Sequence, residues 1–306
     1  VHLRSEEPAM GWVPADIPDL TGRRAIVTGA NAGLGLEVAH GLAAHGAEVV
    51  LACRNTTKAE VAAASIRQRT PAATVEVGAL DLADLDSVAA FAAGCSGRLD
   101  LLVNNAGLMA IDEARTREGA EMQFGVNHLG HFALTARLLP LLLATPASRV
   151  ATMSSMGHRS ARGPGDPRLE RRYDRWQAYF HSKLANLLFT AELQRRLAAA
   201  DASTIAVAAH PGASNTDLGT EGSGISNRGL RLLPHIGQSA ERGARPMLRA
   251  LTDPTVRGGE YYGPRFLAFG ATPVLETPTR AARDADAARR LWDLSVELSG
   301  LEPAFV

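Results

Sequence analysis

Cysteine, net charge and long apolar runs are all scarce in this sequence of 306 residues. Only Cys53 and Cys95 are present, too few for a disulfide framework or a four-thiolate zinc site. The 32 basic residues balance 32 acidic ones, which argues against a nucleic-acid binder and against an acidic disordered tail. The longest purely apolar run, Leu138–Ala144, is far shorter than the roughly 18–20 residues of a membrane span. These absences predict a soluble globular protein.

The opening segment, Val1–Met10, is polar and charged and lacks the apolar core of a signal peptide. Together with the low cysteine content, which suits a reducing compartment, it indicates a cytoplasmic protein. We therefore expect neither a membrane nor a nucleic acid as a partner.

Short apolar runs alternate with longer amphipathic stretches along most of the chain. The short runs suit strands buried on both faces of a sheet, over 24–28, 47–52, 74–80, 99–104, 149–154, 204–210 and 259–262. The amphipathic stretches predict helices over 34–45, 57–69, 85–94, 118–143, 175–200 and 284–299. This alternation predicts an α/β fold, a Rossmann-like doubly wound parallel sheet of about seven strands in a single domain over 1–306. Its cofactor half would cover about 20–155 and its catalytic and substrate half about 156–306.

Two segments interrupt this rhythm. Residues 159–175 carry six arginines among glycines and prolines and indicate a solvated surface loop, with an anion-facing rim as the alternative. Residues 212–229 hold five glycines and suggest a mobile lid over about 212–237 beside the strand ends. An ordinary flexible connection is the alternative for this second segment.

A glycine-rich turn follows the first predicted strand directly. Its sequence, Thr28-Gly29-Ala30-Asn31-Ala32-Gly33-Leu34-Gly35, leads into a helix. Glycines allow a tight turn and a close backbone approach to a pyrophosphate, and the helix N-terminus offers free N–H groups and a positive dipole end. The spacing is G-x-x-x-G-x-G instead of the common G-x-G-x-x-G, so a purely structural turn is the alternative. The position of the motif favours a dinucleotide site.

The end of the second predicted strand bears on the choice of cofactor. Folds that prefer NAD place an acidic residue there to accept the ribose 2′-hydroxyl. This chain has Ala52-Cys53-Arg54-Asn55 instead, and the guanidinium of Arg54 can pair with a 2′-phosphate. Lys58, one helical turn further on, adds charge. The sequence therefore favours NADP over NAD, with a merely solvated Arg54 as the alternative.

Tyr179 and Lys183 open the longest predicted helix, and their i, i+4 spacing puts both side chains on one face. Arginine supplies almost all of the positive charge, so Lys183 is one of only two lysines in the chain. A phenol of pKa about 10 is a poor base at neutral pH. One ammonium about 4 Å away contributes about 4 kcal/mol at an effective dielectric of 20, enough to lower that pKa by 2–3 units. A surface Tyr–Lys pair is the alternative.

At these positions the sequence resembles the short-chain dehydrogenase/reductase family over nearly its whole length. Thr28-Gly29 through Gly35 is similar to the cofactor turn of the family, and Asn104-Asn105-Ala106-Gly107 is similar to its Asn-Asn-Ala-Gly segment. The segments around Arg54, from Asn127 to Phe132 and from Tyr179 to Asn186 resemble the retinol-dehydrogenase-like branch, which also holds the light-dependent protochlorophyllide reductases. The sequence departs from membrane-bound members in having no N-terminal membrane helix.

The resemblance assigns roles to individual residues. It implies a catalytic tetrad in which Tyr179 is the general acid/base, Ser155 polarises the substrate oxygen, Lys183 binds the nicotinamide ribose and Asn127 holds a water in a proton relay. Of the two adjacent serines the family implies the later one, with Ser154 as the alternative. A purely structural role in a turn is the alternative for both. The implied cofactor contacts also include Gly29, Asn31, Gly33, Leu34, Gly35, Arg54, Lys58, Asp81, Leu82, Asn105, Ala106, Gly107, Pro211, Gly212 and Thr216. The family further implies a homodimer or homotetramer formed through the helices over 118–143 and 175–200, with a monomer as the alternative.

These observations predict an NADP-dependent oxidoreductase that transfers hydride between nicotinamide and a carbonyl or alcohol. Residues beside predicted strand ends or in the lid suggest an apolar pocket for a bulky lipophilic substrate: Leu108, Met109, Met156, Trp176 and Leu218. The alternative is a catalytically idle NADP-binding redox sensor or scaffold. A serine hydrolase is excluded because Ser155 lacks the G-x-S-x-G context. His128 and His131 have no third ligand in view, so we expect packing residues and no metal site.

Overall fold

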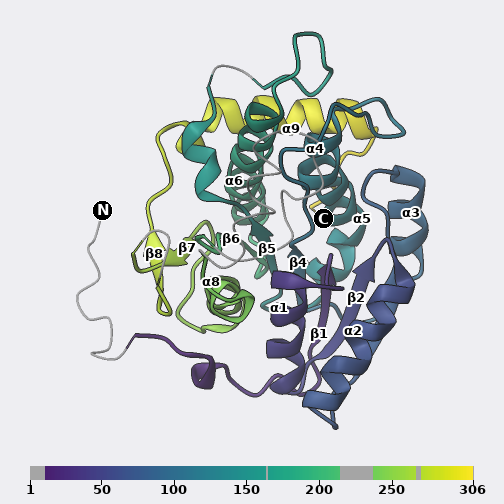
Figure 1. Cartoon of the computed structure of the whole chain (residues 1–306), viewed down its shortest axis with the longest axis vertical. Helices are drawn as coiled ribbons and strands as arrows, with labels where there is room; N and C mark the ends of the chain where they lie inside the picture. Colours follow the sequence, from purple (N-terminus) through teal and green to yellow (C-terminus); the bar gives the residue numbers. More distant parts are fainter. Residues whose placement is uncertain (1–10, 163–164, 214–236, 267–269, 306) are drawn as a thin grey trace.

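The apolar runs of the sequence form one continuous central sheet (Figure 1). The computed structural model describes residues 11–162, 165–213, 237–266 and 270–305. Within these residues the sheet has eight strands in the order β3-β2-β1-β4-β5-β6-β7-β8. Their bounds are Arg24–Thr28 (β1), Glu48–Cys53 (β2), Val75–Ala79 (β3), Leu101–Asn104 (β4), Arg149–Met153 (β5), Ile205–Ala209 (β6), Tyr261–Pro264 (β7) and Pro273–Glu276 (β8). The first seven pair in parallel, and β8 runs antiparallel to β7.

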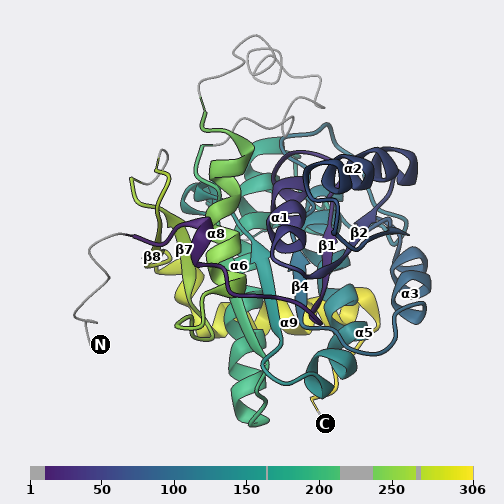
Figure 2. The same cartoon turned by 90° about the horizontal axis from the view of Figure 1, so that it is seen from below.

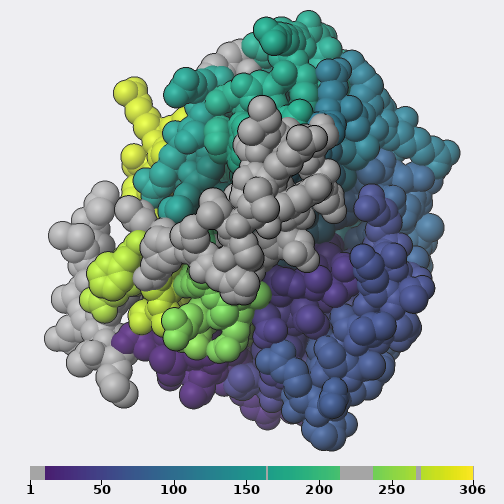
Figure 3. Space-filling model, viewed as in Figure 1, coloured from purple at the N-terminus to yellow at the C-terminus, as the bar shows by residue number. Residues whose placement is uncertain are grey.

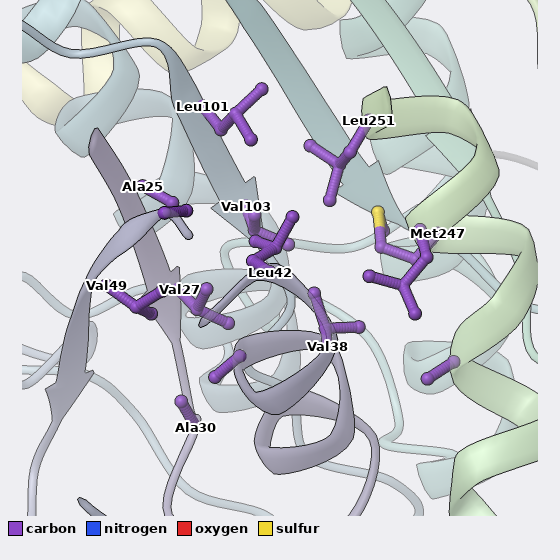
Figure 4. Packing of buried hydrophobic residues seen from close by; sticks show 14 of the residues in the cluster. Ala25, Val27, Ala30, Val38, Leu42, Val49, Leu101, Val103, Met247 and Leu251 are labelled. Carbon is purple, nitrogen blue, oxygen red and sulfur yellow. The ribbon is translucent and has the colours of Figure 1, made fainter. Parts of the chain in front are cut away.

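Helices cover both faces of the sheet, as its doubly apolar strands require (Figures 1 and 2). Alternate residues of β1 point to opposite cores: Ala25 and Val27 to one, Ile26 to the other. The first core contains α1 (Gly33–Ala44), α2 (Thr56–Arg69) and α8 (Ala240–Thr252), and Figure 4 shows Val38, Leu42, Met247 and Leu251 closing over the strands. The second core contains α3 (Leu85–Ala93), α5 (Gly130–Ala144), α6 (Arg175–Ala199) and α9 (Ala285–Ser299).

The strand order reverses between β1 and β4, because the chain leaves β1 toward β2 and β3 and then returns to its other side. Such a switch point opens a crevice at the carboxyl ends of the strands, where α/β proteins bind ligands. Thr28 ends β1 and Asn104 ends β4, so the glycine turn and the Asn-Asn-Ala-Gly segment meet there. The predicted fold class is therefore confirmed.

The sequence did not predict helix α8 and strand β8, and it predicted one helix where the described chain has three successive helical segments. Helix α8 does have helical apolar spacing, with Ala244, Met247, Leu248 and Leu251 buried, but Pro246 in its interior is typical of a helix break. Strand β8 is a four-residue edge strand that begins at Pro273 and is too short for a clear pattern. With β8 the sheet has eight described strands instead of about seven. The helix predicted over 118–143 is divided into a short α4 (Met122–Phe124), a π-helical turn η2 (Gly125–Leu129) and α5.

Helix α9 lies across α6 and α5 and covers the outer side of this helix pair (Figure 1). The indole of Trp292 packs edge-on against Phe132 of α5 at 5.1 Å and stacks on Phe189 of α6 at 6.1 Å between ring centroids. The guanidinium of Arg196 lies 4.4 Å above the same indole. None of the described helices combines the length and the apolar character needed to cross a bilayer.

Candidate active site

The glycine turn has the shape of a dinucleotide cradle. Gly29 has φ +65°, and a Cβ there would lie 2.9 Å from Cα and Cβ of Ala106, so only glycine fits. A Cβ on Gly35 would lie 2.5 Å from Asn105 Nδ2. Helix α1 then begins at Gly33, and its N-cap residue Ala32 has no side-chain acceptor for the first N–H groups. A pyrophosphate fits this turn because it can approach the backbone closely and accept from these groups.

The hydroxyl of Thr28 joins this turn to the segment after β4. Its Oγ1 accepts hydrogen bonds from the backbone N–H groups of Asn105 (2.9 Å) and Ala106 (3.0 Å), and Asn105 Nδ2 donates to the Thr28 carbonyl at 2.8 Å. The same Oγ1 lies 2.8 Å from His131 Nε2. Cofactor contacts were predicted for Asn105, Ala106 and Gly107 and packing for His131, but the hydrogen bonds of the Thr28 hydroxyl were not foreseen. The sequence signal that could have identified Thr28 is the position of its hydroxyl directly before the glycines.

The predicted contacts at the adenosine end lie at the ends of β2 and β3. Arg54 follows β2 immediately and is exposed. The side chain of Asn55 caps α2 by accepting from Lys58 N at 2.9 Å, which places the exposed Lys58 in the first turn of that helix. Asp81 is partly exposed and accepts from Ala83 N at 3.0 Å. Leu82, by contrast, buries its side chain in the second core and presents no side chain to the crevice.

Ser155 and Tyr179 meet at the carboxyl end of β5. The side chain of Asp174 caps α6 through the N–H groups of Trp176 (2.9 Å) and Gln177 (3.1 Å), and Tyr179 is buried in the second turn of this helix. The Ser155 hydroxyl is close enough to the phenol of Tyr179 to lower its pKa. The Ser154 hydroxyl is buried and donates to the Lys183 carbonyl at 2.9 Å. The geometry therefore favours Ser155 over Ser154 as the residue beside the phenol.

Burial shifts the pKa of both Tyr179 and Lys183. It raises the pKa of Tyr179 to about 12, although the Ser155 hydroxyl opposes this rise. It lowers the pKa of Lys183 to about 8. Lys183 Nζ donates to the Met153 carbonyl at 3.3 Å and lies 5.9 Å from the centroid of the Tyr179 ring. The expected lowering of the phenol pKa is therefore wrong for the protein residues alone, because desolvation of the phenolate is the largest influence on it.

Asn127 stands in the π-helical turn and is fully buried. Its side chain brackets the backbone of Leu108: Oδ1 accepts from Leu108 N at 2.7 Å, and Nδ2 donates to Leu108 O at 2.9 Å. Nδ2 also donates to Ser182 Oγ at 2.8 Å, so both amide hydrogens are used within the protein. A Cβ on Gly107 would lie 3.2 Å from Asn127 Oδ1 and 3.3 Å from Lys183 Nζ. The predicted residues Gly107, Asn127 and Lys183 therefore lie close together. Because both amide hydrogens of Asn127 are already used, a water bound here would have to donate a hydrogen bond to Asn127.

Pro211 and Gly212 follow β6, next to a histidine that the sequence analysis did not single out. Gly212 N donates to His210 Nδ1 at 3.1 Å, and His210 Nε2 lies 2.9 Å from Glu276 Oε1 of β8. Gln238 Nε2 donates to the Pro211 carbonyl at 2.6 Å. The antiparallel edge strand therefore supports the backbone at Gly212. Thr216, Leu218 and the predicted lid beyond Ala213 lie outside the described residues.

Comparison with known proteins decides the family. A family model described as short chain dehydrogenase matches residues 23–223. The chain belongs to the short-chain dehydrogenase/reductase family. Its oxidoreductase class and the predicted retinol-dehydrogenase-like branch are thereby confirmed.

Relatives within this family match along most of their length. Retinol dehydrogenase 12 from Homo sapiens is 39% identical over 288 residues, which cover 92% of this chain and 88% of the relative. Retinol dehydrogenase 11 from Mus musculus is 41% identical with the same coverage. The crystal structure of an uncharacterized protein from Mycobacterium paratuberculosis has a TM-score of 0.80 and 45% identity and covers 96% of this chain and 100% of its own. A short chain dehydrogenase from Shigella flexneri complexed with NADP has a TM-score of 0.62 and 25% identity, over 80% and 98% of the two chains.

The arginine-rich segment of this short-chain dehydrogenase is held by ion pairs. Arg159 pairs with Glu276 (3.2 Å), and Arg168 pairs with Glu297 (2.6 Å). Two further pairs are Arg171–Asp166 (3.9 Å) and Arg175–Asp112 (2.9 Å). These contacts favour the prediction of a solvated surface loop over that of an anion-facing rim.

The remaining candidate residues of this family member are partly exposed apolar side chains or core histidines. Leu108, Met109, Met156 and Trp176 are partly exposed, and Trp176 packs on Phe180 with 6.0 Å between ring centroids. Seen from outside, the purple and blue cofactor half and the teal catalytic half share one face of the molecule (Figure 3). His128 packs among Phe124, Phe132 and Phe189. Within the described ranges no group of three or more His, Cys, Asp or Glu could hold a metal ion.

Proposed function

We propose that this short-chain dehydrogenase uses NADP(H) to interconvert a lipophilic carbonyl compound and its alcohol. The observation that carries the proposal is the buried phenol of Tyr179, whose pKa the Ser155 hydroxyl influences, followed one turn later by the buried ammonium of Lys183. These groups stand at the strand-end crevice that the glycine turn opens. When bound, NADP(H) supplies or accepts the hydride at the carbonyl carbon.

The protein residues manage the oxygen and its proton. Ser155 donates a hydrogen bond to the substrate oxygen, where negative charge develops as the carbon gains hydride. Tyr179, with a pKa of about 12, is protonated at neutral pH and gives its proton to that oxygen. The charged form of Lys183 then stabilises the phenolate, and a water that donates to Asn127 Oδ1 returns a proton from solvent. In the alcohol-oxidising direction these transfers run in reverse.

The preference for NADP is supported by the charge at the end of β2. Arg54 stands exposed where an acidic residue would receive a ribose 2′-hydroxyl, and Lys58 follows in the first turn of α2. A guanidinium can pair with a 2′-phosphate through two parallel hydrogen bonds. The Shigella flexneri relative described above is complexed with NADP, which agrees with this choice.

A bulky lipophilic substrate is supported by partly exposed apolar side chains and by the names of the relatives. Leu108, Met109, Met156 and Trp176 are apolar and partly exposed, and Met156 directly follows Ser155 in the chain. Several relatives of about 40% identity are named retinol dehydrogenases. Both observations favour an apolar carbonyl compound over a sugar or a small acid.

Titration with NADPH followed by turnover of a ketone panel tests the proposal. We expect the unaltered protein to bind NADPH and to oxidise it with lipophilic aldehydes or ketones. Tyr179→Phe should keep NADPH binding within a few-fold and lose most turnover, because it removes only the proton donor. Full turnover by this variant would contradict the assignment. NADPH binding without turnover of any carbonyl compound by the unaltered protein would favour an idle cofactor-binding protein.

A further inference from the structure

His131 lies between the cofactor turn and the catalytic centre. It stands in the first turn of α5, directly after the π-helical turn, and is 1% exposed. Its Nδ1 lies 3.0 Å from the backbone carbonyl oxygen of Asn127, and its Nε2 lies 2.8 Å from Thr28 Oγ1. The ring thus touches residues that are about a hundred positions apart in the sequence.

The partners of the ring determine where its hydrogen resides. A carbonyl oxygen can only accept, so Nδ1 carries the hydrogen and donates to Asn127. Burial lowers the pKa of His131 to about 4, which keeps the ring neutral and leaves Nε2 as an acceptor. The hydroxyl of Thr28 therefore donates to Nε2, which at 2.8 Å is nearer than the Val103 carbonyl at 3.2 Å. The lone pairs of Thr28 Oγ1 are then directed to the N–H groups of Asn105 and Ala106.

We propose that His131 is a positioning residue that couples the cofactor turn to Asn127. Through Thr28 it sets the hydrogen bonds that place Asn105 and Ala106 against Gly29. Through the Asn127 backbone it orients the residue whose side chain holds Leu108 and Ser182. Ser182 in turn donates to the Tyr179 carbonyl at 2.7 Å. The inference deepens the proposed function and rests on it.

Packing on two sides fixes the position of the His131 ring. Small shifts of the chain therefore cannot restore a hydrogen bond that a substitution of His131 removes. Gly130, the preceding residue, packs its Cα against the backbone of Leu82, where a Cβ would collide with the carbonyl oxygen. Thr28 is fully buried and held by the backbone of the segment after β4. Replacing the imidazole by an apolar ring therefore leaves the Thr28 hydroxyl and the Asn127 carbonyl without this partner.

His128 provides a matched control three residues away. It is also 1% exposed, and its Nε2 lies 2.8 Å from Ser295 Oγ of α9, away from the cofactor turn. Both His131→Phe and His128→Phe replace a buried imidazole by a larger ring and remove a buried hydrogen bond. Both are expected to lower Tm, whereas only the first should change cofactor binding.

The test compares NADPH affinity, measured by fluorescence titration, with kcat for the best ketone. We expect His131→Phe to raise Kd for NADPH about tenfold, the size of one lost buried hydrogen bond, and to lower kcat several-fold. His131→Asn keeps a donor near the Nδ1 position and should raise Kd similarly while keeping most of kcat. His128→Phe should leave both constants within about twofold of the unaltered protein.

A double-variant cycle with Thr28→Val probes the coupling itself. If both residues act through one hydrogen bond, Thr28→Val with His131→Phe should bind NADPH no more weakly than the weaker single variant. Additive losses would overturn the coupling, as would unchanged NADPH affinity in His131→Phe. If His131→Phe does not fold, His131→Asn tests the same change in Kd. Failure of the unaltered protein to bind NADPH would instead refute the proposed function.

Discussion

The hydroxyl of Ser154 donates a hydrogen bond of 2.9 Å to the backbone carbonyl of Lys183. This bond ties the end of β5 to the catalytic helix and uses the serine that does not face the phenol. The neighbouring Ser155 is left to contact Tyr179. One of the two adjacent serines thus has a structural contact, and the other is available for the chemical role that we propose for it.

This division predicts opposite effects of two alanine substitutions. Ser155→Ala should lower kcat by about 100-fold or more, because it removes the donor to the developing oxyanion, and should leave Tm nearly unchanged. Ser154→Ala should lower the free energy of unfolding by about 1–2 kcal/mol and reduce kcat only several-fold. Steady-state kinetics and thermal unfolding on both variants check the assignment, and a larger loss of kcat in Ser154→Ala would reverse it.

The lowered pKa of Lys183 predicts how activity depends on pH. The lysine is charged below about pH 8 and loses its proton above it. Because only the charged form stabilises the Tyr179 phenolate, kcat for carbonyl reduction should fall as the pH rises past about 8. A rate profile under saturating NADPH measures this. A kcat that rises between pH 8 and 10 would contradict the role given to Lys183.

The same burial predicts that Lys183→Met stabilises the protein while abolishing most turnover. Between about pH 8 and the ordinary lysine value of 10.5, the unfolded lysine keeps a proton that the folded one has lost. The unfolded state binds more protons there, so the free energy of unfolding rises with pH. Below pH 8 the lysine is charged in both states, and its desolvation lowers the free energy of unfolding by roughly 3 kcal/mol, as the size of the pKa shift indicates.

Thermal unfolding of the protein without added cofactor checks this stability prediction. At pH 7 the methionine variant should have the higher Tm, and the difference should shrink between pH 8 and 10. An equal difference at all pH values would mean that packing, and not the charge of Lys183, separates the two proteins.

Arg54→Asp should reverse the preference between the two nicotinamide cofactors. The substitution replaces a cation that can pair with a 2′-phosphate by an anion that repels it and can accept a ribose hydroxyl. We expect KM for NADPH to rise at least tenfold and KM for NADH to fall or stay unchanged. Arg290→Asp makes the same charge change on the exposed side of α9 and is the control. An unaltered NADPH preference in Arg54→Asp would refute this contact.

Gly29→Ala and Gly22→Ala separate backbone strain from collision. Both glycines have positive φ, +65° and +76°, so both alanines incur roughly 1–2 kcal/mol of strain. A Cβ on Gly22 meets nothing within 4 Å, whereas one on Gly29 collides with Ala106. Gly29→Ala should therefore lose NADPH binding, measured by titration, while Gly22→Ala should only lower Tm. Equal NADPH affinity in the two variants would show that the turn tolerates a side chain.

The parts of the molecule that follow local patterns were predictable from the sequence. The strand ending at Thr28 and the helix carrying Tyr179 and Lys183 follow from apolar runs and i, i+4 spacing. Helix α8 also has helical apolar spacing, but Pro246 in its interior argues against a helix there, and the four-residue strand β8 follows no such pattern. The π-helical turn at Asn127 likewise has no periodic signal in the sequence.

Interactions between distant segments were the hardest part of the site to foresee. The hydrogen bond between Thr28 and His131 joins residues 103 positions apart, and no local motif indicates it. The phenol pKa was predicted with the wrong sign because the sequence shows the charge of Lys183 but not the depth at which Tyr179 is buried. Burial depends on the whole fold, whereas the identity of a neighbouring charge can be read from spacing.

Helix α9 has a consequence for self-association. With Trp292 seated on Phe132 and Phe189, each molecule supplies from its own chain the apolar cover that a second copy could otherwise provide for α5 and α6. This cover favours a monomer over the homodimer or homotetramer that the family implies through these helices. We expect every copy to work independently, so that the rate per molecule stays constant on dilution and light scattering gives the mass of one chain. Trp292→Ala would loosen this helix and expose an aromatic surface. We expect the variant to aggregate before it loses catalytic activity.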